Sequence, residues 1–347
     1  MNKKILLSAP LGAPGPMAAL KNHQATLSPF FHVDLISLEE LISPAYVKAR
    51  EHRRLLYRIC KKMKIVTSVE KIVPYGENVI FGTFHPVHEG IIRKLNRLDI
   101  RPSFMWCSTL GQMEFTPHEI KLFARLIALL EKGNIRFLFL HRRLFDSMSY
   151  FVKKATFLPH SIDLVPYGHV QKLDMPGFHV DLFCRPRLGK NILNQIAAFR
   201  MAKIDGTLHV NFDTKQFRGI VEEIASNIVQ HQWVPFDEYL RLVAGMGLSL
   251  QVTIGESFNY AVCERMCLGV PVLTTRDIYL VAEDYFLAEH LCVEAPDTPS
   301  AIARVIRHIA GDQKLRSEVA EACKSRIGQV AKQNNKIVRD EICHRFR

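Results

Sequence analysis

The stretch from Leu248 to Thr274, LSLQVTIGESFNYAVCERMCLGVPVLT, predicts a strand, a tight loop, a helix, a tight turn and a second strand. Apolar runs occupy Leu248–Ile254 and Pro271–Thr274, and apolar residues at helical spacing lie between them in Tyr260–Leu268. Strand–helix–strand alternation of this kind encodes a parallel sheet covered by helices. The C-terminal half is therefore predicted to hold an α/β domain.

The N-terminal half shows the same alternation, so we expect two successive open α/β domains with a cleft between them. A looser stretch after Leu158 places the boundary there. We expect an N-terminal domain over residues 1–157, a C-terminal domain over 158–330, and a C-terminal helix over 331–347 that packs back toward the N-terminal domain. The strands expected in the N-terminal domain are Lys4–Ala9, Val33–Ile36, Val79–Phe84, Pro102–Trp106 and Arg136–Leu140.

Composition favours a folded cytoplasmic protein. Of the 347 residues, 48% are hydrophobic and 23% charged, which allows a buried core and argues against global disorder. The apolar run Ile5–Leu7 is too short for a signal peptide, and no run approaches the roughly 20 residues of a membrane span. The eight cysteines include no Cys-x-x-Cys pair, which predicts reduced thiols and neither a structural disulfide nor a metal site.

The net charge of +12 points to an anionic partner. Much of the excess lies in a probable amphipathic helix over residues 45–64. Two interpretations fit this basic helix. It is either a solvated helix with an apolar stripe that faces the core, or a surface that binds phospholipid headgroups, an anionic glycan or nucleic acid. Its basic residues are Lys48, Arg50, Arg53, Arg54, Arg58, Lys61, Lys62 and Lys64.

Two loops at the predicted strand ends carry charged residues. The loop Glu256–Asn259 opens a helix, so its backbone N–H groups and the helix dipole suit a diphosphate. Glu256 and Glu264 could accept hydrogen bonds from sugar or ribose hydroxyls, although a helix-start acid and a surface glutamate would look the same. Arg185 and Lys190 follow another strand and could neutralise a pyrophosphate, or simply form a basic surface turn.

Taken together, these loops resemble the C-terminal domain of the group 1 (family 4) glycosyltransferases. That family has an Arg and a Lys with four residues between them, then two glutamates with seven between them, then Gly-x-Pro-Val. The segment around Val234 resembles the part that lines the nucleotide base, and Pro159–Asp163 resembles the domain junction. The matching motif residues here, in order, are Arg185, Lys190, Glu256, Glu264 and Gly269-Val270-Pro271-Val272.

The resemblance implies the GT-B fold, with two Rossmann-like domains facing each other across a cleft. It implies that Arg185 and Lys190 bind the donor diphosphate and stabilise the leaving group, while Glu256 holds the transferred sugar and Glu264 the ribose. Backbone N–H groups of Ser257, Phe258 and Asn259 would complete the donor site. The family transfers sugar with retention of anomeric configuration and needs neither a metal nor a cofactor beyond its nucleotide-diphosphate sugar.

The acceptor side departs from the family pattern. Gly12 stands in Gly12-Ala13-Pro14-Gly15 where the family has a Gly-Gly loop, and Cys107-Ser108-Thr109 stands where its catalytic histidine is expected. His85 is then the candidate catalytic histidine. Among acceptors, a lipid-linked or cell-envelope glycan on the inner membrane face would explain the basic helix. Modified nucleic acid is the alternative acceptor, and a non-catalytic nucleotide-sugar or glycan-binding protein is the alternative class.

Overall fold

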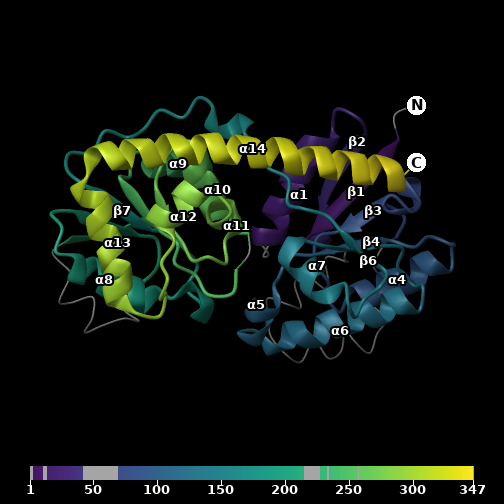
Figure 1. The fold of residues 1–347 in the computed structure, drawn as a ribbon. Coiled ribbons are helices and arrows are strands. Elements are labelled where there is room, and N and C mark those ends of the chain that lie inside the picture. The colour runs from purple at the N-terminus through teal and green to yellow at the C-terminus, as the bar shows by residue number, and fades with distance from the viewer. Residues whose placement is uncertain are drawn as a thin grey trace. The chain divides into compact units, whose positions relative to one another are not determined.

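The chain folds into two compact units, shown in Figure 1 of this computed structural model. Unit 1 comprises Met1–Ser108, Thr116–Asp163 and Asn334–Arg347, and unit 2 comprises Thr109–Phe115 and Leu164–Gln333. The structure describes residues 3–10, 14–41, 69–214, 227–232, 234–256 and 258–346. The predicted basic helix over 45–64 lies within the interval 42–68, outside the described residues.

Unit 1 is built on a parallel sheet with the strand order β2-β1-β3-β4-β5-β6. Its inner strands are short apolar runs buried on both faces, as expected of parallel sheets between helical layers, whereas the two edge strands are only partly buried. They are β1 (Lys4–Ala9), β2 (His32–Ser37), β3 (Val79–Phe81), β4 (Ser103–Trp106), β5 (Leu138–Leu140) and β6 (Ala155–Phe157). The helices are α1 (Pro14–Leu27), α4 (His88–Asn96), α6 (Pro117–Glu131) and α7 (Arg142–Met148). All five strands expected in this half are confirmed, most of them shorter than the apolar runs that predicted them.

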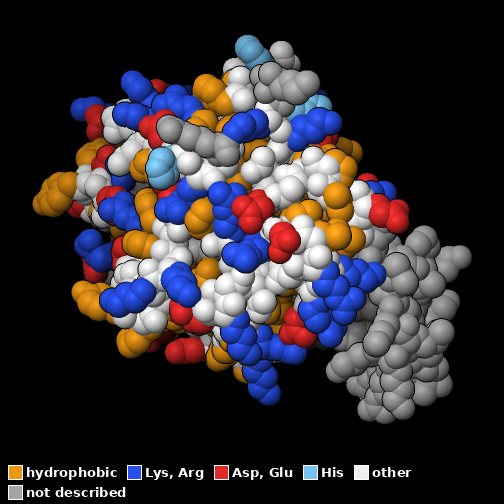
Figure 2. Space-filling view, turned by 90° about the vertical axis from the view of Figure 1, so that its right-hand side faces the viewer, with side chains coloured by type: hydrophobic (Ala, Val, Ile, Leu, Met, Phe, Trp, Pro, Cys, Tyr) orange, Lys and Arg blue, Asp and Glu red, His pale blue; other side chains and the backbone are white. Residues whose placement is uncertain are grey.

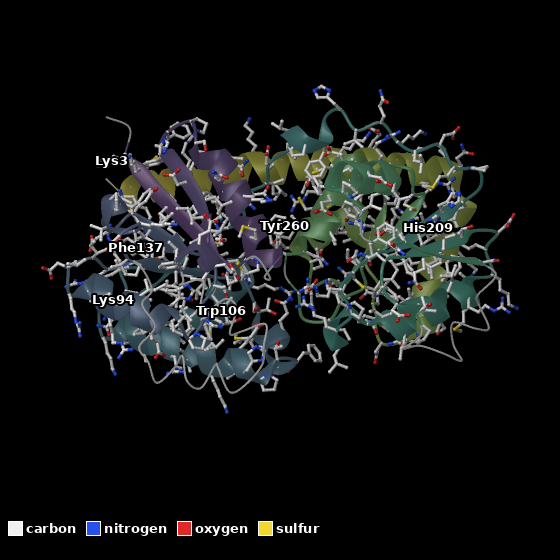
Figure 3. The ribbon with its side chains drawn as sticks, turned by 180° about the vertical axis from the view of Figure 1, so that it is seen from behind. Lys3, Lys94, Trp106, Phe137, His209 and Tyr260 are labelled. Atoms are coloured by element: carbon white, nitrogen blue, oxygen red, sulfur yellow. The ribbon has the colours of Figure 1, made fainter. Side chains whose placement is uncertain are left out.

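Unit 2 has a second parallel sheet, with the strand order β11-β10-β7-β8-β9. The strands are β7 (His179–Leu182), β8 (Thr207–Val210), β9 (Ile228–Gln230), β10 (Leu248–Leu250) and β11 (Val272–Leu273). Its helices are α5 (Leu110–Glu114), α8 (Ile192–Ala202), α9 (Phe236–Ala244), α10 (Tyr260–Leu268), α11 (Tyr279–Ala282), α12 (Tyr285–Leu291) and α13 (Pro299–Gly311). His209 on β8 and Tyr260 at the start of α10 are labelled in Figure 3.

Each sheet reverses its direction of growth at one point. In unit 1 the reversal falls between β1 and β3, and in unit 2 between β7 and β10. Open α/β sheets bind ligands outside the carboxyl ends of their strands at such switch points, because the loops diverge there. The loops after β7 and β10 are therefore the ones to inspect in unit 2.

The long helix α14 (Gln313–Arg345) contributes residues to both units. In unit 1 its Asn334 side chain donates to the carbonyl of His160 at 2.9 Å. Phe346, just beyond it, is fully buried with its ring centroid 6.1 Å from that of Phe137 and 6.4 Å from that of Phe139. Phe137 is labelled in Figure 3, as is Trp106 at the end of β4. The last residues of the chain are thus part of the core of unit 1.

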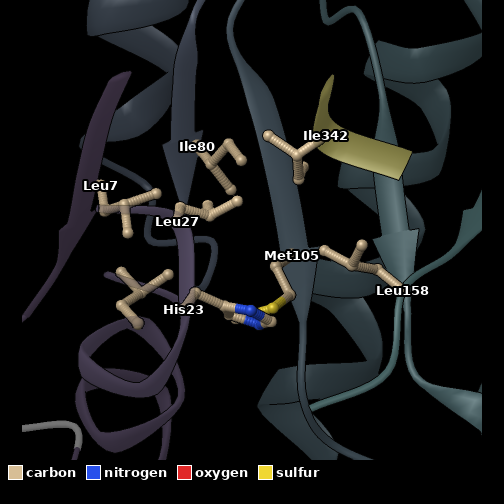
Figure 4. A pocket seen from close by; sticks show the side chains of 8 residues that line it. Leu7, His23, Leu27, Ile80, Met105, Leu158 and Ile342 are labelled. Carbon is tan, nitrogen blue, oxygen red and sulfur yellow. The ribbon is translucent and has the colours of Figure 1, made fainter. Parts of the chain in front are cut away.

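A small cavity in unit 1 lies among Leu7, His23, Met105 and Ile342 (Figure 4). Its volume of about 10 Å³ is close to the smallest that can hold one water molecule. Burial lowers the pKa of His23 to about 4, and its Nδ1 lies 2.8 Å from the hydroxyl of Ser161. The cavity is too small for a substrate and belongs to the packing of the core.

No helix in the described ranges combines the length and the apolar character that a membrane crossing requires.

We expect Phe346→Ala to lower the free energy of unfolding of unit 1 by about 3–5 kcal/mol, because it deletes a fully buried ring. The measurement is urea denaturation monitored by the fluorescence of Trp106. The chain has two tryptophans, so Trp233→Phe is introduced in all the proteins to leave Trp106 as the only one. Phe151→Ala is the matched control, because Phe151 is 80% exposed in the same unit and should change the free energy by less than about 0.5 kcal/mol. Equal effects of the two variants would contradict the packing of the C-terminal residues described above.

Candidate functional site

The loops after β7 and β10 meet at the switch point of unit 2. The backbone N–H of Ile254 donates to the carbonyl of Gly189 at 2.8 Å and joins the two loops. Gly255 has φ +80°, a left-handed conformation that glycine adopts without strain. Asn259 then caps α10, its side-chain oxygen accepting from the N–H of Ala261 at 2.9 Å. Asn259 itself is in extended backbone, with φ −126° and ψ 113°.

Glu256 lies at the centre of this site with its side chain only 5% exposed. One carboxylate oxygen accepts from Arg187 Nη2 at 2.6 Å, from Lys190 Nζ at 2.8 Å and from Gln112 Nε2 at 3.1 Å. The other accepts from Lys190 Nζ at 3.0 Å and Asn259 Nδ2 at 2.8 Å. Burial alone would raise the pKa of Glu256, but Lys190 and Arg187 outweigh it and hold that pKa below its ordinary value. Glu256 is therefore a buried carboxylate kept ionised by two cations.

Two of the residues predicted from the sequence, Lys190 and Glu256, contact each other directly. Arg185 is exposed, and no hydrogen bond or ion pair joins it to another described residue. The arginine that reaches Glu256 is Arg187, which the sequence reading left without a role. Both arginines lie in the loop that ends at Lys190, and the role of Arg185 at a diphosphate stays a prediction.

Glu264 sits in a different environment, about one turn into α10. Its carboxylate accepts from the hydroxyl of Tyr239 at 2.7 Å and from Arg265 Nη1 at 3.3 Å. Burial raises the pKa of Glu264 above its ordinary value despite these contacts. The two predicted glutamates therefore differ electrostatically, since the pKa of Glu256 is lowered and that of Glu264 is raised.

The sequence reading missed the buried ion pair beneath the site. The side chains of Arg265 and Asp181 are both fully buried, with Nη2 2.7 Å from the carboxylate oxygen. Arg265 also donates through Nε to Ser249 Oγ at 3.1 Å and contacts the hydroxyl of Tyr239. These bonds join the last turn of α10 to β7 and β10, so they fix the helix relative to the strands of the switch point. Because Arg265 directly follows Glu264 and charged helix residues are mostly exposed in proteins, its burial left no signal in the sequence.

The remaining predicted residues are distributed as follows. Gly12 and Ser257 lie outside the described residues. Phe258 packs with its ring centroid 4.7 Å from that of Tyr260, and Val234 lies half-buried just before α9.

His85 belongs to unit 1, in the loop after β3 at the switch point of that sheet. Its backbone N–H donates to Nδ1 of His88 at 2.8 Å. His88 is fully buried against Phe81 and Phe104, and burial lowers its pKa to about 3, so it is a neutral core side chain. His85 is only partly buried and remains the candidate at this strand end.

Within the described ranges, no three His, Cys, Asp or Glu side chains gather as metal ligands would.

Solved structures share this architecture, although the sequence matches no protein-family model and no curated protein. HepE from Anabaena, solved with UDP and glucose, superposes with a TM-score of 0.70 at 13% identity and covers 99% of this chain and 98% of its own. Sucrose-phosphate synthase from Thermosynechococcus elongatus gives 0.69 at 14% identity, with 99% and 100% covered. A glycosyltransferase from Rickettsia africae gives 0.67 at 12% identity, with 99% of both chains covered.

These similarities span almost the whole chain and confirm the expected fold. The protein has the GT-B fold, with two Rossmann-like α/β domains. Sequence identities of 12–14% are too low to carry over an activity, so they establish the fold alone.

We expect Arg265→Leu to lower the free energy of unfolding of unit 2 by about 3–5 kcal/mol, because it leaves the carboxylate of Asp181 buried without its cation. The double variant Arg265→Leu/Asp181→Leu should recover part of this loss, since it removes both buried charges. Arg276→Leu is the matched control, because Arg276 pairs with Glu294 at the same 2.6–2.7 Å distance but on the exposed surface. Denaturant unfolding of the four proteins is the measurement, and equal losses for Arg265→Leu and Arg276→Leu would contradict this account.

Proposed function

We propose that the protein is a glycosyltransferase that transfers a sugar from a nucleotide-diphosphate sugar bound by unit 2. The observation that carries this proposal is the cluster of Lys190 and Arg187 on the buried carboxylate of Glu256, at the switch point of a GT-B domain. The cluster combines cations that suit a diphosphate with a carboxylate that suits sugar hydroxyls. HepE, which shares the fold, was solved with UDP and glucose.

In this proposal the diphosphate binds the cations of the β7 loop. Lys190 acts as a point charge, and Arg185 and Arg187 offer planar guanidinium groups that match phosphate oxygens. These groups stabilise the negative charge that develops on the leaving diphosphate as the bond to the sugar breaks. The backbone N–H groups of Phe258 and Asn259, just before α10, add partial positive charge, as would that of Ser257 in the sequence prediction. No divalent metal is needed, because these donors offset the charge of the leaving group.

Glu256 and Glu264 take separate roles on the donor. Glu256 is ionised and close to the cations, so it accepts hydrogen bonds from hydroxyls of the transferred sugar. Glu264 lies farther along α10 beside Tyr239 and accepts from the ribose. Val234 and its neighbours before α9 line the base. The reaction retains the anomeric configuration of the donor.

Unit 1 takes the acceptor, with His85 in the loop after β3 at its switch point and Gly12 assigned from the sequence alone. The acceptor is a lipid-linked or cell-envelope glycan, and the enzyme works in the cytoplasm on the inner face of the membrane. Two observations support an anionic surface as the partner: the net charge of +12 and the Lys and Arg side chains spread over the face in Figure 2.

A nucleotide-sugar donor should raise the melting temperature of the wild type, because a ligand at 100 times its dissociation constant stabilises by about 2.7 kcal/mol. A thermal-shift screen of nucleotide sugars makes this measurement. Lys190→Ala should abolish the shift, and comparison of Arg185→Ala with Arg187→Ala tells which arginine binds the diphosphate. The proposal fails if no nucleotide sugar or nucleoside diphosphate shifts the melting of the wild type.

Glu256→Gln should separate diphosphate binding from sugar transfer. Because the carboxylate competes with a diphosphate for Lys190 and Arg187, the variant should bind nucleoside diphosphate at least as tightly as the wild type. Hydrolysis of the nucleotide sugar should be lost, since the sugar no longer meets an ionised carboxylate. Calorimetric titration and product release measure the two effects. Hydrolysis at the wild-type rate would remove Glu256 from the site, and absence of hydrolysis in the wild type would favour a non-catalytic binding protein.

A further inference from the structure

The segment Thr109–Phe115 follows β4 of the unit 1 sheet in sequence but packs as part of unit 2. It forms the short helix α5, which Thr109 caps. The hydroxyl of Thr109 accepts from the N–H of Gln112 at 3.1 Å, and the side-chain oxygen of Gln112 accepts from the N–H of Thr109 at 3.0 Å. This reciprocal capping box gives the segment a defined conformation.

Close backbone approaches hold this segment against the candidate site. The Thr109 hydroxyl donates to the carbonyl of Gly255, the residue before Glu256. A Cβ added to Gly111 would lie 3.2 Å from the Cα of Gly255, and one added to Gly189 would lie 3.2 Å from the ring of Phe115. Glycine at these positions therefore permits a contact that a side chain would obstruct.

Gln112 is oriented by these contacts. Its side-chain oxygen is committed to the N–H of Thr109, so its NH₂ group faces away from the cap and donates to Glu256 Oε1 at 3.1 Å. The opposite amide orientation would place an oxygen against a carboxylate and an NH₂ against an N–H, with both hydrogen bonds lost. The cap thus delivers one neutral donor to the buried carboxylate, beside the charged donors Arg187 and Lys190.

We propose that Gln112 is a positioning residue for the sugar-binding end of the donor site, acting through Glu256. The proposal rests on the proposed function, in which Glu256 accepts from hydroxyls of the transferred sugar. A diphosphate draws on the charge of Lys190 and Arg187, whereas Gln112 is neutral and can stay on Glu256 when Arg187 turns to phosphate. Gln112 then fixes the plane of the carboxylate toward the sugar, and a change at Gln112 acts on recognition of the sugar and not on the diphosphate.

Calorimetric titration of wild type and Gln112→Ala with UDP-glucose and with UDP tests this proposal. If the thermal-shift screen finds a nucleotide sugar that binds more tightly, that sugar and its nucleoside diphosphate replace UDP-glucose and UDP. The affinity for UDP should be unchanged. The advantage of the nucleotide sugar over UDP should fall about tenfold or more, as expected when a hydrogen bond to a charged group is lost. In donor hydrolysis kcat should fall more than KM rises, because the carboxylate is left less ordered. A tenfold loss that falls equally on UDP and UDP-glucose would indicate a merely structural role and overturn the proposal.

Gln112→Glu is the matched second variant, because a glutamate oxygen can still accept from Thr109 and keep the capping box. It replaces the donor to Glu256 with a second carboxylate, so selectivity for the nucleotide sugar should be lost at neutral pH. Selectivity should return in part as the pH falls, because a proton shared by the two carboxyls restores a donor. A pH profile equal to that of the wild type would overturn the proposal. If no nucleotide sugar or diphosphate binds the wild type, the proposed function itself fails, which is a different result from equal binding by wild type and variants.

Discussion

Burying the carboxylate of Glu256 is the constraint on which the candidate site depends. An ionised carboxylate without partners in a protein interior costs many kcal/mol, so it stays charged only if donors surround it. Here the donors come from three separate segments: the loop after β7, the start of α10 and the capped helix α5. Because all three must converge on one carboxylate, its burial fixes their relative positions within unit 2.

A buried ion pair next to the site, between Arg265 and Asp181, holds the helix that follows Glu256. Arg265 and Asp181, on the central strand β7, compensate each other, and Arg265 also donates to Ser249 and the Tyr239 hydroxyl. Helix α10 is thereby fixed, through its last turn, on the strands that carry the two loops. Glu256 and Glu264 then acquire opposite pKa shifts, because one faces two cations while burial dominates at the other.

The sequence predicted what depends on local pattern. Apolar runs located β1 to β5 of unit 1 but not β6, and the residues after Ile254 identified the loop with Glu256, because strand ends and helix starts are encoded within a few residues. It could not choose Arg187 over Arg185, since both lie in one loop and only the backbone path decides which reaches the carboxylate. Gln112 and Glu256 are 144 positions apart, so no local pattern joins them. The burial of Arg265 depends on Asp181, 84 positions away.

The charge balance of the site also explains why its two cations are not equivalent. The side chain of Lys190 is 12% exposed and contacts both oxygens of Glu256, whereas that of Arg187 is 53% exposed and contacts one. Moving Lys190 from the carboxylate to another anion would break two buried contacts, while moving Arg187 breaks one contact in partial solvent, where charges interact less strongly. Arg187 can therefore turn to a phosphate at smaller cost, and Lys190 can bind a phosphate while still holding Glu256. In this arrangement Lys190 contacts the carboxylate and the phosphate at the same time, whereas Arg187 leaves the carboxylate to bind the phosphate.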